Sequence, residues 1–181
     1  MEIKINALVL NRNNYQWCEV FGYTSKGQPG IEIIGLGARG RAIKEKLTYL
    51  SKRRRLTFPV LRFVICVEGE NLDKADVEFL ELPILLAFWS MATVVPIKRL
   101  DHCFCSGRVS LEGEVSYLEI SNNIWEHLES NLQKKNKEIV YLGRAGDIES
   151  ERIRVIEAHN LLEETVGGFF YMDRTLAKFS I

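Results

Sequence analysis

The chain has 181 residues, which is enough for one domain with a hydrophobic core. Hydrophobic residues make up 46% of it and charged residues 27%, a composition typical of a globular protein rather than a disordered or fibrous one. Lys plus Arg and Asp plus Glu each number 24, so net charge excludes a general attraction to nucleic acids or membranes, and any such attraction must come from local clusters.

Hydrophobic periodicity and turn residues predict a mixed α/β fold. In chain order we expect strands over 3–10, 16–23 and 31–36, a helix over 42–50, a strand over 61–68, a helix over 77–92, strands over 103–110 and 114–120, a helix over 122–135, strands over 139–142 and 152–157, and a short helix over 160–166. The first helix carries Ile43, Leu47 and Leu50 at i, i+4 and i+7, so these residues should form its buried face. No linker or repeat separates the elements, and we expect one domain over 1–170 with a C-terminal tail over 171–181.

Neither the N-terminus nor the longest apolar run is typical of a membrane or export signal. The N-terminal residues are interrupted by charges, and the apolar run over 82–97 has 16 residues and contains Pro83 and Pro96. We therefore predict a buried helix that breaks before Pro96 and no membrane association. Four cysteines without a secretory signal predict free thiols and a cytoplasmic location.

Three glycines lie between a predicted strand and a predicted helix. Gly35, Gly37 and Gly40 have the spacing G-x-G-x-x-G, which is typical of a turn that holds a dinucleotide pyrophosphate at a helix N-terminus. In such folds an acidic residue about 20 positions later holds the ribose, but here arginines occupy 53–55. The first acid at a strand end, Glu68, follows Gly35 by 33 residues. A nucleotide-dependent oxidoreductase is an alternative that rests on the glycine spacing alone.

A basic cluster covers the same predicted helix and its end. Between residues 39 and 55 there are eight cations and one acid, Glu45, which gives a net charge of +7 in a chain of net charge zero. The cations are Arg39, Arg41, Lys44, Lys46, Lys52, Arg53, Arg54 and Arg55. Local clusters of this kind bind phosphate backbones, although a run of charges is more often a solvated helix face. We predict contact with nucleic acid or another acidic partner, with solvated surface as the alternative.

Five stretches of the chain follow one another in the order of a known family. They are "GQPGIEIIGLG", "AIKEKL", "TFP", "NLDKADVEFLELPILLAF" and "LDHCFCSGRVSLEGEV". Together they resemble the N-terminal domain of ComM-like, or magnesium-chelatase-related, proteins. The resemblance covers about residues 3–170 and implies the ribosomal-protein-S5-domain-2-like fold, a mixed sheet with packed helices that is shared with the Lon peptidase domain. It also implies that the glycines form a strand-to-helix turn of that fold.

The resemblance implies binding rather than catalysis. In ComM-like proteins the domain precedes an AAA+ ATPase and the family acts on DNA, but the chain contains no G-x-x-x-x-G-K-[ST] loop for phosphates. Lon relatives use a Ser–Lys dyad, whereas Leu82 and Pro83 stand where the serine should fall and the expected lysine helix has none before Lys134. We expect a non-catalytic, cofactor-free binding or assembly module that docks on DNA, on an AAA+ ATPase or on itself. A Lon-like peptidase with a displaced dyad is a further alternative.

Two cysteines close together raise the question of a metal. On a strand, Cys103 and Cys105 would point to one face, and two thiolates could begin a zinc site. A closed zinc site needs four ligands, and the other cysteines, Cys18 and Cys66, lack the C-x-x-C spacing. We therefore predict core cysteines and no metal.

Overall fold

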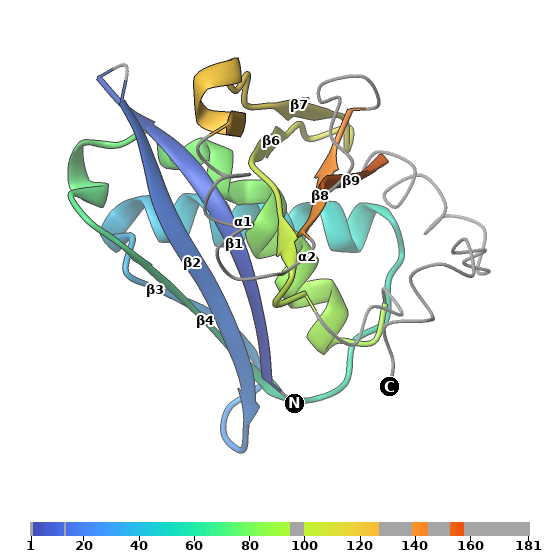
Figure 1. The fold of residues 1–181 in the computed structure, drawn as a ribbon. Coiled ribbons are helices and arrows are strands. Elements are labelled where there is room, and N and C mark those ends of the chain that lie inside the picture. Colours follow the sequence, from blue (N-terminus) through green and yellow to red (C-terminus); the bar gives the residue numbers. More distant parts are fainter. Residues whose placement is uncertain (1, 13, 95–99, 127–138, 145–152, 158–181) are drawn as a thin grey trace.

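A seven-stranded mixed sheet is the main feature of the computed structural model, which describes residues 2–12, 14–94, 100–126, 139–144 and 153–157 (Figure 1). Its strands are, in spatial order, β3 (Gly30–Ile34), β4 (Arg62–Gly69), β2 (Asn14–Ser25), β1 (Glu2–Asn11), β5 (Cys103–Phe104), β8 (Ile139–Gly143) and β9 (Ile153–Glu157). Within this sheet β2 alone runs against the direction of the other strands. The β1–β2 hairpin is therefore joined on both sides to strands from later in the chain.

Two helices cover one face of the sheet (Figure 1). They are α1 (Gly37–Arg53), which connects the parallel neighbours β3 and β4, and α2 (Glu81–Met91), which follows the short 3-10 helices η1 (Leu72–Lys74) and η2 (Val77–Leu80). A separate two-stranded sheet consists of β6 (Gly107–Val109) and β7 (Val115–Tyr117), and residues 122–126 are helical. The helix α2 packs on the large sheet and also contacts β6.

The main core lies between the helices and the large sheet. Ile43, Leu47 and Leu50 of α1 are buried, which confirms the predicted core face of this helix. Every residue of α2 is buried, as expected for a helix that is apolar on all sides. Full burial of one such aliphatic side chain contributes about 1.5–3 kcal/mol, so these two helices account for much of the stability of the fold.

A second, smaller core lies on the opposite face of the sheet, over β1, β5 and β8. Phe104 stacks on Tyr141 with ring centroids 5.4 Å apart and meets Trp125 edge-on at 5.9 Å. Leu8 and Leu118 complete this cluster. The segment after β7 thus covers one half of this face, while over β2 and β3 the same face exposes Tyr23 and Ile34.

The predicted mixed α/β fold is confirmed, and the first four strands lie within two residues of their predicted limits. The third strand ends at Ile34 because Gly35 turns the chain with a φ of +98°. The first helix is longer than predicted and begins at Gly37, and the helix predicted over 77–92 is divided into η2 and α2. The end of the helix predicted over 122–135, the helix predicted over 160–166, the tail over 171–181 and the boundary at 170 lie outside the described residues.

The strand predicted over 103–110 is wrong, because β5 and β6 belong to different sheets. Ser106, which is buried between them, explains the break. Its hydroxyl accepts a 2.6 Å hydrogen bond from the Leu8 backbone N–H and donates one of 2.8 Å to the Cys105 carbonyl. These two bonds satisfy polar backbone groups where the chain leaves the large sheet.

Gly35 and Gly37 provide a matched test of the β3–α1 turn. Both have positive φ values, +98° and +54°, but a Cβ at Gly35 would lie 2.2 Å from the Val67 carbonyl oxygen, whereas one at Gly37 would meet nothing within 4 Å. We expect Gly37→Ala to cost about 1–2 kcal/mol of unfolding free energy. Gly35→Ala should cost about 1–3 kcal/mol more, because the backbone of β4 must also move. Urea unfolding of both variants measures the difference, and equal losses would contradict the close contact.

Candidate functional site

The glycine turn has much of the local geometry of a dinucleotide-binding turn. Gly35 makes the tight turn against β4, and the backbone at Gly37 faces open space. A Cβ at Gly40 would lie 3.3 Å from Ile33 Cγ2, so this glycine lets α1 pack closely on β3. Tight turn, open backbone and close helix packing are the three roles that glycines have in the dinucleotide motif.

Glu68 is closer to this turn than its place in the sequence indicates. It follows Val67, the residue against which Gly35 packs, and it lies near the end of β4, the next strand of the βαβ unit. The separation of 33 residues arises because α1 has 17 residues and a further stretch over 54–61 returns the chain to β4. Chain distance was therefore a poor guide to spatial distance here.

Two other features argue against a dinucleotide at the turn. Arg39, in the first turn of α1, donates hydrogen bonds to the carbonyls of Leu72 and Ala75, so the segment after β4 lies against the start of the helix. In addition, β3 is the edge strand of the large sheet. Doubly wound folds bind dinucleotides in a crevice between strands whose connections diverge, and no described strand lies beyond β3 to form one.

Within the basic cluster, Lys46 has a buried acidic partner. Its ammonium nitrogen lies 2.7 Å from both carboxylate oxygens of Glu81, a residue that is 4% exposed. The Val109 backbone N–H donates a 2.9 Å hydrogen bond to the same carboxylate. Glu81 therefore joins α1, α2 and β6 at one point. Together with Arg39, Lys46 is committed to internal contacts.

The importance of this buried pair can be measured with a double-mutant cycle. Lys46→Met leaves the Glu81 carboxylate buried without its cation, and we expect a loss of about 3 kcal/mol in unfolding free energy. In a Glu81→Gln background the same change should cost about 1 kcal/mol or less, because the neutral amide still accepts from Val109 and needs no cation. Lys26→Met, at an exposed position, is the control. If Lys46→Met lowered the unfolding free energy equally in both backgrounds, the result would contradict the stabilising role of the Lys46–Glu81 pair.

Two arginines at the end of α1 pack against the β6–β7 turn. Arg53 Nη1 donates a 2.8 Å hydrogen bond to the Leu111 carbonyl and lies 3.8 Å from a carboxylate oxygen of Glu112. The guanidinium of Arg54 occupies the space beside Gly113, where a Cβ would lie 2.3 Å from it. These contacts fix the direction in which the end of the helix presents its charge.

The four remaining cations of the cluster face outward. They are Arg41, Lys44, Lys52 and Arg55, of which Lys44 is half-buried and the others exposed. The first three lie on one stripe of α1, about 16 Å long, and Arg55 extends it beyond the helix end. In the part of the chain that the structure describes, none of the four forms an ion pair. We call this set the outward stripe.

Tyr49 is a site residue that sequence reasoning missed. It is 50% exposed and lies one helical turn from Lys52 and Arg53, so an aromatic ring stands among the cations. The sequence contained the signal, because position 49 lies outside the helix face formed by Ile43, Leu47 and Leu50. An exposed ring within a basic surface is typical of proteins that stack bases of single strands.

A groove of about 610 Å³ runs between β3 and α1. Residues 30–33 of β3 form one wall, and Gly37, Gly40, Arg41 and Lys44 of α1 lie along the other. The groove thus joins the open edge of the large sheet to the N-terminal half of the outward stripe. Its backbone wall has no signature in the sequence, because it depends on β3 being the edge strand.

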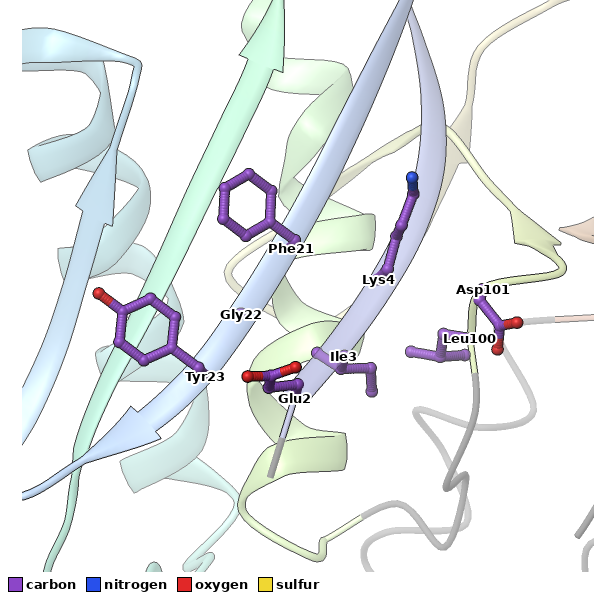
Figure 2. Close-up of a pocket in the computed structure, with 8 residues that line it drawn as sticks. All are labelled: Glu2, Ile3, Lys4, Phe21, Gly22, Tyr23, Leu100 and Asp101. Atoms are coloured by element: carbon purple, nitrogen blue, oxygen red, sulfur yellow. The ribbon is translucent and has the colours of Figure 1, made fainter.

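Another hollow, of about 470 Å³, lies on the face of the sheet away from α1 (Figure 2). The rings of Phe21 and Tyr23 stand on this face, and Lys4 points away from Glu2 and forms a 2.6 Å ion pair with Glu19. Its described lining residues thus include two aromatic rings and a lysine that already has an acidic partner.

The cysteines do not form a metal site in the described residues. No group of three or more His, Cys, Asp or Glu side chains in this part of the chain could hold a metal ion. Cys18, Cys103 and Cys105 are buried and free, which agrees with the prediction of core cysteines. Burial raises the pKa of Cys18 to about 11 and, with the carboxylate of Asp101, that of Cys103 to about 12.

Cys66 should be the one reactive thiol of the native protein. It is half-buried, and its pKa is raised by burial and by the carboxylates of Glu68 and Glu32. At pH 8 we expect a disulfide reagent to modify Cys66 first, with a rate that rises with pH as the thiolate forms, and all four cysteines to react after unfolding in urea. Thiol titration with mass mapping measures this. Native modification of the three buried cysteines as fast as in the unfolded chain would contradict their burial.

Comparison with known proteins does not identify the chain. No family model matches the sequence, and no curated protein matches it. The resemblance to ComM-like proteins therefore stays a prediction, and function is inferred from the chemistry of the site. Within the described residues, no helix combines the length and apolar character needed to cross a bilayer.

Proposed function

We propose that the chain is a non-catalytic binding module that holds a single-stranded nucleic acid on α1. The observation that carries this proposal is the outward stripe, a row of cations on a helix whose other cations, Arg39, Lys46 and Arg53, contact other parts of the chain. Cations distributed over about 16 Å of one surface can contact several phosphates of the same strand. Tyr49 adds a ring on which a base can stack.

The strongest alternative for the stripe is solvated surface. Cations at the C-terminal end of a helix are favoured by the helix dipole, which explains part of the charge at Lys52 and Arg53 without any ligand. The dipole does not explain Arg41, which lies in the second turn of α1 and is exposed. It also does not explain the exposed tyrosine one helical turn from Lys52. A polyanionic partner accounts for all of them together.

The proposal includes a cellular setting. Four free cysteines support a reducing, cytoplasmic compartment. The resemblance to ComM-like proteins supports an AAA+ ATPase as a protein partner and self-association as an assembly mode. It also supports the S5-domain-2-like assignment of the fold. The ATPase partner, the self-association and the fold assignment rest on the resemblance, whereas nucleic-acid binding rests on the surface of α1.

Binding of a fluorescent 20-nucleotide oligothymidine tests the proposal. We expect affinity to fall as salt rises, because each neutralised phosphate releases counterions. Lys52→Glu with Arg55→Glu should weaken binding about tenfold or more and reduce the slope of log affinity against log salt by roughly one to two. Tyr49→Leu should weaken binding to the single strand severalfold with little change in this slope, because stacking releases no counterions.

The charge control is Arg12→Glu, in the β1–β2 turn, which lies far from the end of α1 (Figure 1). This variant changes the net charge in the same direction and should retain most of the affinity. No binding of the oligonucleotide at low salt, or an equal loss per charge in the Arg12→Glu control, would leave the stripe as solvated surface. Circular dichroism of each variant establishes that the fold is retained.

A further inference from the structure

Among the residues that the structure describes, none pairs with the outer edge of β3, so this edge offers unpaired backbone groups. β3 pairs with β4 on one side and is the end of the strand order on the other. The Gly30 N–H donates a 3.1 Å hydrogen bond to the Leu61 carbonyl, which places the backbone groups of Gly30 on the β4 side. Because successive residues of a strand direct these groups to opposite sides, Ile31 and Ile33 direct theirs to the free edge.

The side of α1 that faces this edge leaves space beside the strand. Along the groove, α1 presents Gly37 and Gly40, which have no side chains to fill the space beside the strand. Arg41 and Lys44 line the same groove from the next positions on the helix. Natural edge strands are usually covered, bulged or blocked by an inward charge, and β3 instead has a hollow of about 610 Å³ beside it.

The charge of the groove selects an acidic occupant. Glu32 and Arg62, on its sheet side, form an ion pair with each other and cancel. On the helix side Arg41 and Lys44 outnumber the single acid, Glu45. The groove therefore combines main-chain donors and acceptors spaced for an extended chain with a net positive wall.

We propose that the groove binds an extended acidic segment of a partner protein as an added strand on β3. The segment pairs its main chain with Ile31 and Ile33 and directs acidic side chains toward Arg41 and Lys44. Phosphate backbones lack alternating amide donors and carbonyl acceptors, so a nucleic acid would use the cations and leave the strand edge unpaired. The groove shares Arg41 and Lys44 with the outward stripe, whereas Lys52, Tyr49 and Arg55 of the proposed nucleic-acid surface lie outside it.

The test uses an eight-residue peptide of alternating Glu and Val with a fluorescent label, titrated with the full chain at low salt. Three comparisons are informative: the same peptide with alternate amides N-methylated on one edge, a Lys–Val peptide of the same length, and protein variants. We expect N-methylation to weaken binding about tenfold, because it removes main-chain hydrogen bonds and blocks the approach to β3. The Lys–Val peptide should bind at least tenfold more weakly than the acidic one.

The variants distinguish the groove from the part of the proposed nucleic-acid surface that lies outside it. Arg41→Glu with Lys44→Glu should abolish peptide binding, whereas Lys52→Glu with Arg55→Glu should leave it within about twofold. Amide NMR shifts induced by the peptide should include Ile31 and Ile33. Equal affinity for the acidic and N-methylated peptides, or shifts confined to α1, would overturn strand addition. Failure of the acidic peptide to bind at low salt would also overturn strand addition. So would displacement of the peptide by oligothymidine from the Lys52→Glu, Arg55→Glu variant, since this result would assign the groove to nucleic acid.

Discussion

The buried carboxylate of Glu81 is the constraint on which the arrangement of the surface depends. Glu81 is the first residue of α2, and its carboxylate pairs with the ammonium of Lys46 on α1. The same carboxylate accepts a hydrogen bond from the backbone N–H of Val109 on β6. A charge in this position is costly unless every one of its partners is in place. The rotation of α1 about its own axis is therefore fixed by a polar contact as well as by its apolar face. Hydrophobic packing alone would tolerate small rotations of a helix; a bidentate contact at 2.7 Å is far less permissive.

Because the rotation of α1 is fixed, the cations of the basic cluster have different environments. Arg39 and Lys46 hold neighbouring elements, and Arg53 and Arg54 pack on the β6–β7 turn. Arg41 and the other outward cations are left for solvent or a ligand. A helix of 17 residues can carry a high positive charge without self-repulsion unfolding it, because its charges point in three directions. The net charge of a segment is thus a weak measure of the charge that it presents to a partner.

Local patterns predicted local structure well. The apolar pattern over 3–10 predicted the first strand, and the spacing of Ile43, Leu47 and Leu50 predicted the buried face of α1. The break at Ser106 was not predictable, because it depends on a hydrogen bond to Leu8, which is 98 residues away in the chain. Short strands of two or three residues, such as β5 and β6, carry too little periodicity to be told from one continuous strand.

Sequence identified the candidate site only in part. The cluster of cations was visible in one dimension, but which of them are exposed depends on Glu81 and on carbonyls of distant residues. Glu81 itself could have been suspected, since it is the single acid at the start of an otherwise apolar helix. The edge position of β3 could not have been predicted, because it follows from the spatial order of strands that lie far apart in the chain. The same order explains why Glu68 lies beside the glycine turn despite its distance in sequence.

The strand order also determines when each strand can pair with its neighbours during synthesis on the ribosome. Once residue 69 has emerged from the ribosome, β1 to β4 and α1 can already form a four-stranded unit, with β3 at one border and β1 at the other. The border at β1 has its final neighbour only when β5, at residues 103 and 104, has emerged. At about 5–20 residues per second, this leaves a nascent sheet with an unpaired margin for a few seconds. During this interval the nascent chain is most exposed to mispairing with other chains, and a chaperone would have its greatest effect then.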